Sequence, residues 1–257
     1  MNVRAFFIIV YVCLLLSLLP IAGCFGGGGG GGGGDGESAP QGNLVPNAHA
    51  FGCFLEDYSD PVTSDYILPY QVGMTFRVSQ GNCGRFTHQP VCNTGGFPCG
   101  DLRYSYDFFI QIGLVILAAR GGTVLATEDQ FSNSTTRALE ENFVTIEHSD
   151  GTIARYLHLS PNSLMVNPGD MVSQGDPIAL AGDSGFTGTT PTFANPHLHF
   201  DVMESDSSTC TQKPATLAAN GGIIVVSGCK TVPVTFRNAQ PLDTPLIETQ
   251  FYTALLF

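Results

Sequence analysis

The spacing of turn residues is the feature that most limits what this chain can fold into. Glycine, proline, asparagine and aspartate interrupt the chain about every ten residues, and the runs between them are short and rich in valine, isoleucine and phenylalanine. Runs of this length suit β-strands, because a helix needs a longer segment with a helical repeat of apolar residues. The sequence therefore predicts an all-β fold, built mainly from antiparallel sheet with few short helices.

The expected strands are segments in which β-branched and aromatic residues recur between turn signals. They are Ser105–Ile110, Gly122–Thr127, Asn142–His148, Thr152–Leu159, Pro177–Ala181, His197–Met203, Gly222–Ser227 and Val232–Arg237. Turns are expected at Ser149–Gly151, Asn167–Asp170 and Gly182–Gly185, where glycine supplies a positive φ. Thr135–Glu141 is a candidate for a short helix, although a polar excursion between two strands fits these residues as well.

The N-terminal residues have the pattern of an export signal. The apolar run Ala5–Pro20 follows the basic residue Arg4 and is too short to span a bilayer comfortably, which is typical of a signal-peptide core. Ile21–Cys24 resembles the bacterial lipobox, in which the cysteine is lipidated and becomes the new N-terminus. We therefore expect a signal peptide at residues 1–23 and a lipid anchor at Cys24. Cleavage near Ala22 without lipidation is the alternative.

A run of nine glycines, Gly26–Gly34, comes directly after this segment and behaves as a flexible coil. We expect residues 24–45 to form a lipidated tether and residues 46–257 to form one domain. The formal net charge of -12 gives the chain no general attraction for nucleic acid or anionic lipid. Nucleic acid is therefore not an expected partner.

Six cysteines lie beyond the tether: Cys53, Cys83, Cys92, Cys99, Cys210 and Cys229. An even number after an export signal indicates disulfides formed in an oxidising compartment, and no Cys-x-x-Cys pair suggests a thiolate metal site. The sequence leaves the pairing open. We expect Cys92–Cys99 and Cys210–Cys229 to close local loops, which leaves Cys53–Cys83 as the third pair.

The triplet His197-Leu198-His199 is the strongest candidate for a chemical site. Alternate side chains of a strand share a face, so the two histidines point the same way while Leu198 and Phe200 enter the opposite layer. One imidazole can then hold a metal while the other contacts a water molecule. Taken alone, the triplet also fits two hydrogen-bonded, partly exposed histidines.

Several further motifs occur in a fixed order along the chain. They are Tyr104–Phe108, Gly122-x-Val124, Tyr156–Leu159, Gly169-Asp170-x-Val172-x-x-Gly175, Gly182-x-x-Gly185-x-x-Gly188 and Pro196–Phe200. Together they resemble the lysostaphin-type (LytM-like) zinc metallopeptidases, and the resemblance covers residues 69–203. It implies the peptidase fold of that family, with one Zn²⁺ per chain held by a histidine, an aspartate and the second histidine of the His-x-His.

Asp107 and His199 correspond directly to two of the family's ligands. The first histidine often lies four residues before the aspartate, where this chain has Arg103. Some members place it further upstream, in a segment similar to Gln80–His88, and the resemblance then implies His88 as the first ligand. The stretch Gln89–Leu102 would be an inserted loop.

Two imidazoles and one carboxylate suit zinc and leave a coordination position open, as a catalytic site requires. By the same resemblance, His158 and His197 would orient or deprotonate a water molecule and stabilise the oxyanion, with the division of roles open. Ser184 lacks the spacing of a nucleophile elbow. We interpret His148 as structural and His49 as solvated.

The resemblance implies a zinc metalloendopeptidase that hydrolyses amide bonds in peptidoglycan stem peptides or cross-bridges. Two alternatives remain. Arg103 leaves room for an inactive LytM-like binding module that activates other cell-wall hydrolases, and fold analogy also allows a secreted zinc peptidase for non-wall peptides. Phe25 after Cys24 resembles the sorting signal of lipoproteins in the outer membrane. We therefore expect the protein in the bacterial cell envelope, lipid-anchored and facing the periplasm.

Overall fold

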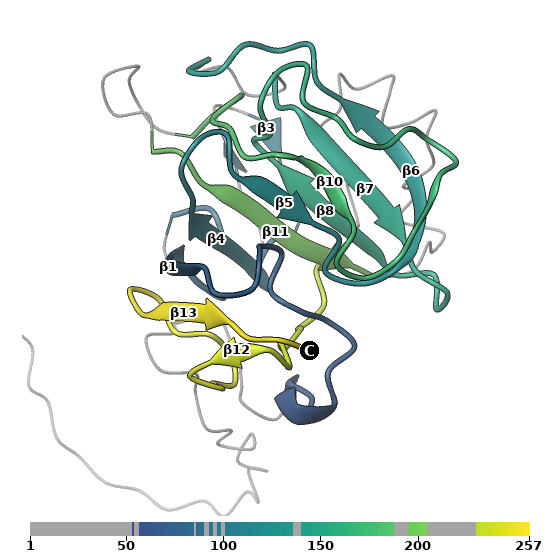
Figure 1. Cartoon of the computed structure of the whole chain (residues 1–257). Coiled ribbons are helices and arrows are strands. Elements are labelled where there is room, and N and C mark those ends of the chain that lie inside the picture. The colour runs from purple at the N-terminus through teal and green to yellow at the C-terminus, as the bar shows by residue number, and fades with distance from the viewer. Residues whose placement is uncertain are drawn as a thin grey trace, which may run out of the picture. The chain divides into compact units, whose positions relative to one another are not determined.

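The structure is a computed structural model that describes residues 53, 57–84, 86–89, 93–94, 97–98, 101–135, 140–187, 195–204 and 230–257. All of them lie in one unit that spans Gln41–Phe257. One large antiparallel sheet dominates this unit (Figure 1), so the expected all-β fold is confirmed. Within the described residues, no helix combines the length and apolarity needed to span a membrane.

The large sheet has nine strands in the order β12-β13-β1-β4-β11-β8-β7-β6-β9. Its strands are β1 (Thr75–Gln80), β4 (Ser105–Phe109), β6 (Gly122–Glu128), β7 (Phe143–Glu147), β8 (Ile153–Leu157), β9 (Met171–Val172), β11 (Leu198–Met203), β12 (Ala239–Gln240) and β13 (Phe251–Ala254). Two-stranded sheets are formed by β5 (Val115–Leu117) with β10 (Pro177–Leu180), and by β2 (Asn93–Thr94) with β3 (Phe97–Pro98). A short 3-10 helix, η2 (Pro61–Thr63), is capped at its N-terminus by Asp60, whose side chain accepts a hydrogen bond from Val62 N.

The hydrophobic core lies against one face of the large sheet. Tyr106 and Phe108 of β4 and Phe200 of β11 are fully buried on this face, and Ile116 of β5 and Ala179 of β10 belong to the same cluster. The strands β5 and β10 lie over the sheet in Figure 1. Because strand residues alternate between faces, Asp107 and His199 point to the opposite side. The fold thus separates the core from the candidate site.

A β-bulge in β1 places two functional side chains on that second face. Arg77 pairs with Phe109 and Val78 with Phe108, but the register then shifts, so that Gln80 pairs with Asp107. The extra residue, Ser79, reverses the alternation of the strand beyond it. Both Arg77 and Gln80 therefore share the face of Asp107, although they are three positions apart.

Six of the expected strands, from Ser105–Ile110 to His197–Met203, are confirmed with ends that shift by one or two residues. The prediction for Val232–Arg237 is wrong. Val234 and Phe236 are buried in the core, but the segment is not a strand: Val232 N donates to Val202 O of β11 at 2.8 Å, and further on Arg237 N donates to Tyr66 O, in a loop, at 3.0 Å. The alternating pattern in this segment reflects the burial of its apolar side chains and not its pairing in a sheet. Gly222–Ser227 and most of Thr135–Glu141 lie outside the described residues.

The Cys53–Cys83 disulfide is present in the structure. Cys83 also donates its backbone N–H to Arg103 O at 2.7 Å. This hydrogen bond links the disulfide-bonded loop after β1 to the segment that precedes β4. Cys92, Cys99, Cys210 and Cys229 lie outside the described residues, as do Cys24 and the whole tether. Their predicted pairing and lipidation stay predictions.

Candidate metal centre

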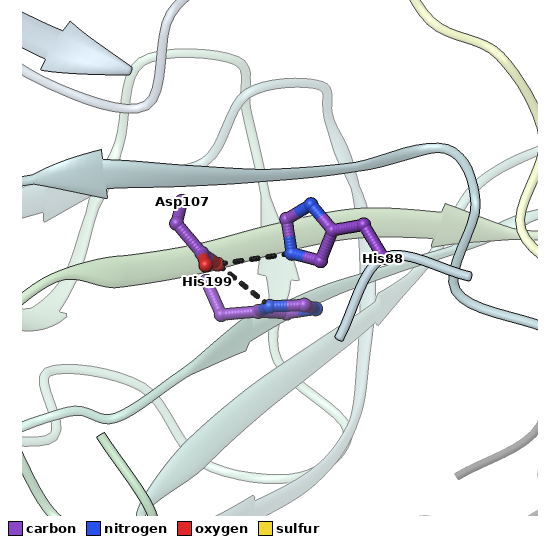
Figure 2. A group of neighbouring side chains, drawn as sticks. All are labelled: His88, Asp107 and His199. Atoms are coloured by element: carbon purple, nitrogen blue, oxygen red, sulfur yellow. Dashed lines mark hydrogen bonds and ion pairs between the residues drawn. The ribbon is translucent and has the colours of Figure 1, made fainter. Parts of the chain in front are cut away.

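Three side chains that are far apart in the sequence meet on the second face of the sheet. One ligand atom from each of His88, Asp107 and His199 lies within 4.8 Å of the others, and all three residues are buried (Figure 2). Asp107 of β4 and His199 of β11 are direct partners across the strands. His88 comes from the segment that follows β1. The sheet register fixes two members of this cluster and a loop supplies the third.

The histidines converge on one oxygen of the aspartate. Asp107 Oδ1 lies 3.2 Å from His88 Nε2, 2.9 Å from His199 Nδ1 and 3.6 Å from His197 Nε2. The His158 ring is 4.7 Å from the His197 ring and 6.3 Å from the His199 ring. The five residues that the sequence singled out as ligands or catalytic groups are therefore brought together.

Backbone carbonyls set the tautomer of three of these rings. The Nδ1–H groups of His88, His158 and His197 donate to the carbonyls of Gly81, Ser184 and Asn195, at 2.8, 2.8 and 2.7 Å. A ring whose Nδ1 carries the proton keeps its Nε2 lone pair for another partner. Each of these three histidines therefore offers Nε2 for metal binding or proton transfer.

His199 has the opposite arrangement. Its Nε2 lies 3.0 Å from Asp201 Oδ2, which leaves Nδ1 facing Asp107. Asp201 is in turn held by Arg155, whose Nε and Nη2 donate to its two carboxylate oxygens at 2.7 and 2.5 Å. Both partners of this ion pair are buried. A carboxylate behind a histidine is a common support for metal ligands, because it fixes the tautomer and the ring orientation.

Gln80 connects the loop of His88 to the aspartate. Its Nε2 donates to Thr87 Oγ1 at 2.8 Å and to Asp107 Oδ2 at 3.3 Å. Its Oε1 accepts the backbone N–H groups of Phe86 and Thr87 at 3.1 and 3.4 Å. One buried amide therefore orients the free oxygen of Asp107 and holds the chain next to His88.

Burial and neighbouring charges shift the pKa values of these groups. Burial alone would raise the pKa of Asp107, but His88, His197 and His199 together hold it well below its usual range. Burial would lower the pKa of His199, yet hydrogen bonds to Asp107 and Asp201 raise it to about 9. Burial, together with His197 and His199, keeps the pKa of His158 well below 6.5. His158 is therefore neutral at physiological pH.

The donor set of this cluster fits a zinc ion. Two imidazole nitrogens and one carboxylate oxygen are a common zinc ligand set when the fourth position is left open. His88 Nε2 is buried and makes no hydrogen bond to the described residues, although Asp107 Oδ1 is close to it. A metal ion would give this nitrogen the partner that a buried polar atom requires.

Other candidates from the sequence have structural surroundings. Arg103 makes a bidentate ion pair with Asp101, in which Nε donates to Oδ1 at 3.0 Å and Nη2 to Oδ2 at 2.6 Å, and it contributes no atom to the cluster. Ser184 is buried and donates its hydroxyl to Leu159 O at 2.8 Å. His148 donates from Nδ1 to Gly121 O at 2.9 Å and packs edge-on against Tyr66. These contacts support the structural reading of Ser184 and His148.

Sequence reasoning missed Gln80, Arg155 and Asp201 as parts of the centre. The position of Asp201 could have been predicted from the sequence, because it lies two residues after His199 and must share its face in a strand. Gln80 lies in the segment that resembled the upstream ligand motif. The bulge that places its side chain on the face of Asp107 cannot be predicted from the sequence. Arg155 required the register between β8 and β11.

An antiparallel sheet that carries a His–Asp–His cluster, with two more histidines beside it, defines a candidate hydrolytic metal centre. Residues 102–213 match Peptidase family M23, so this part of the chain is similar to that family. Asp107, His158, His197 and His199 lie within the matched residues. His88 lies before them.

Two curated relatives illustrate the similarity. Peptidoglycan DD-endopeptidase ShyA of Vibrio cholerae is 31% identical over 97 residues, which is 38% of this chain and 19% of that protein. Lysostaphin of Staphylococcus staphylolyticus is 30% identical over 125 residues, 48% of this chain and 23% of that protein. The matches thus span about a fifth of the relatives' length. Among solved structures, a zinc-containing peptidase from Vibrio cholerae is 28% identical, with 54% of this chain and 36% of that chain covered and a TM-score of 0.33.

Proposed function

We propose that this protein is a zinc metalloendopeptidase that hydrolyses amide bonds in the peptide part of peptidoglycan. The observation that carries the proposal is the position of His88. Its Nε2 lies 3.2 Å from Asp107 Oδ1 and completes a buried His–Asp–His set with His199, although Arg103 occupies the position four residues before the aspartate. The substrate class is supported by the similarity to ShyA, which is named as a peptidoglycan DD-endopeptidase.

The residues of the centre have two roles, metal binding and proton transfer. When bound, zinc would supply a Lewis acid that polarises the scissile carbonyl and acidifies water. His88, Asp107 and His199 would hold it. His158 is neutral and its Nε2 is free to accept the proton of the attacking water. The His197 ring, 4.7 Å from that of His158, can share this proton and help to deliver it to the leaving amine.

The test measures zinc content by mass spectrometry and the release of soluble peptide from purified peptidoglycan sacculi. We expect about one zinc per chain for the intact protein. His88→Ala and His199→Ala should lose both zinc and peptide release. His148→Asn is the matched control, because His148 is also buried but lies outside the cluster. It should keep both.

Each failure points to a different alternative. If the intact protein binds no zinc and releases nothing, then the enzyme proposal is wrong and a binding module that activates other hydrolases is favoured. If His88→Ala alone keeps its zinc, then the assignment of the first ligand is wrong. If the protein cleaves soluble peptides but not sacculi, a peptidase for non-wall substrates is favoured.

We further propose that the mature protein is anchored by a lipid at Cys24 in the bacterial envelope, facing the periplasm. Support comes from the lipobox-like Ile21–Cys24 and the glycine run that follows it. Labelled palmitate should be incorporated into the intact chain and not into Cys24→Ala. Absence of label from the intact chain would contradict the proposal.

A further inference from the structure

A row of three side chains, a half-buried arginine and two exposed phenylalanines, crosses the same face of the sheet as the metal centre. Arg77 of β1 pairs with Phe251 of β13 on one side and with Phe109 of β4 on the other. The Arg77 guanidinium lies over the Phe109 ring, 5.6 Å from its centroid. Phe109 and Phe251 are 39% and 60% exposed. Two aromatic rings therefore flank a cation at the surface, and we name this set the aromatic–arginine row.

The aromatic–arginine row lies directly beside the catalytic cluster. Phe109 is two residues after Asp107 on β4, so both side chains point to the same face. Leu198 pairs with Phe108. Continuing that antiparallel register by one residue sets His197 next to Phe109. A substrate bound at the cluster can therefore extend over the row without leaving the sheet.

The chemistry of the row suits a carboxylate. Among the described residues, no carboxylate lies within 4.0 Å of Arg77. A guanidinium that stacks on an aromatic face keeps its N–H edge available, and that edge matches the two oxygens of a carboxylate. The chain has only 10 lysine and arginine residues against 22 acidic ones, so a cation without an acidic partner beside the centre is unusual.

We propose that the aromatic–arginine row is a subsite that binds a carboxylate-bearing residue of the substrate peptide. The inference rests on the proposed function. Arg77 is two strands from His197, or about 10 Å at the usual strand spacing. An extended peptide covers this distance in about three residues. The bound acidic residue therefore lies about three positions from the scissile amide, and its side-chain methylene groups pack against the exposed parts of the Phe109 and Phe251 rings on either side of Arg77.

The test compares peptide release from untreated sacculi with release from sacculi whose free carboxyl groups have been converted to amides. The intact protein should act on untreated sacculi about tenfold faster at limiting substrate, since a charge-assisted hydrogen bond accounts for about this factor. Arg77→Met should reduce this preference to nearly one, and Arg77→Lys should restore part of it. Arg237→Met is the matched control, because Arg237 also stacks on an aromatic ring, that of Phe257, and belongs to neither site.

The outcomes separate the two proposals. No release from untreated sacculi by the intact protein refutes the peptidoglycan assignment itself. Release from both substrates at equal rates refutes the subsite, as does a preference that Arg77→Met retains. If Arg77→Met and Arg237→Met lose the preference equally, the effect is structural and the subsite is refuted. Zinc content is measured on every variant to check that the metal centre is intact, and the Arg77 and Arg237 variants should bind as much zinc as the intact protein.

Discussion

Gln80→Met isolates what the bridging amide contributes to the metal centre. Methionine keeps the length and approximate volume of the buried side chain but removes all four hydrogen bonds of the amide. Three of these bonds join neutral groups, and the bond to Asp107 Oδ2, at 3.3 Å, reaches a carboxylate. At about 1 kcal/mol for each neutral bond and about 1.5 kcal/mol for the charged one, the upper limit is roughly 4.5 kcal/mol.

The measured loss should be smaller and mostly local. Phe86 is 75% exposed, so its segment can open and let water replace the bonds to Gln80 Oε1. Opening removes His88 from the cluster. We therefore expect zinc affinity to fall by about 2 kcal/mol, a factor of about 30. The free energy of unfolding of the metal-free protein should fall by about 1 kcal/mol.

Chelator competition measures the zinc affinity, and urea denaturation of the metal-free protein measures its stability. Gln174→Met is the control, because Gln174 Nε2 also donates two hydrogen bonds, to Asp65 O and Ala119 O at 2.7 Å, but lies away from the centre. It should lower stability and leave zinc affinity unchanged. A zinc affinity for Gln80→Met within about threefold of the intact protein would refute the reasoning, since the loss expected for such supporting groups is larger.

Three further predictions follow from other parts of the molecule. Replacing Cys53 and Cys83 with alanine should lower the free energy of unfolding by about 3.5 kcal/mol, from the loop entropy of a 30-residue separation, and a loss below about 1 kcal/mol in non-reducing urea denaturation would contradict this. His158 has φ 65°, in the left-handed region, so His158→Gly should be about 1 kcal/mol more stable than His158→Ala in thermal unfolding, with both variants inactive. Equal stability of the two would count against backbone strain there. Burial lowers the pKa of His148 below 6.5, so stability is complete above pH 6.5 and falls as pH drops toward the folded-state pKa, because only the unfolded state gains the proton. His148→Asn should flatten the urea-denaturation stability profile in that window, and an unchanged slope would oppose the assignment.

The part of the fold that sequence reasoning found is the part that is local in the chain. The strands from Ser105 to Met203 carry strong β patterns between clear turn residues, and the alternation in His197–Phe200 gives the facing of each side chain. Leu198 and Phe200 belong to the hydrophobic core, whereas His199 contacts Asp107 and Asp201 on the other face, which confirms that facing. The two-residue repeat is enough to predict the strands and the face of each side chain, because neither depends on which strand lies next to it.

What the sequence could not give depends on pairing between distant segments. β1 lies between β4, which follows it in the first half of the chain, and β13, which lies near the C-terminal end of the described residues. The polar contacts of Gln80 and the position of Arg77 beside Phe251 follow only from that arrangement. Val232–Arg237 shows the converse error, because an alternating pattern can seat side chains in a core while the backbone bonds elsewhere. The types and spacing of residues predict which side chains are buried. Which strands pair with one another depends on the topology of the sheet.

The bulge at Ser79 divides β1 into two stretches with separate tasks on one face of the sheet. The stretch before Ser79 sets Arg77 in the aromatic–arginine row, and the stretch after it sets Gln80 against Asp107. Substitution within either stretch alters one of these tasks and leaves the other in place. Removing Ser79 would make Gln80 follow Val78 directly, so the ladder would become regular while Arg77 and Gln80 both kept the face of Asp107. Deletion of Ser79 should therefore remove the local bend of β1 without turning either functional side chain away, so this position is where the length of the strand can change while both tasks are kept.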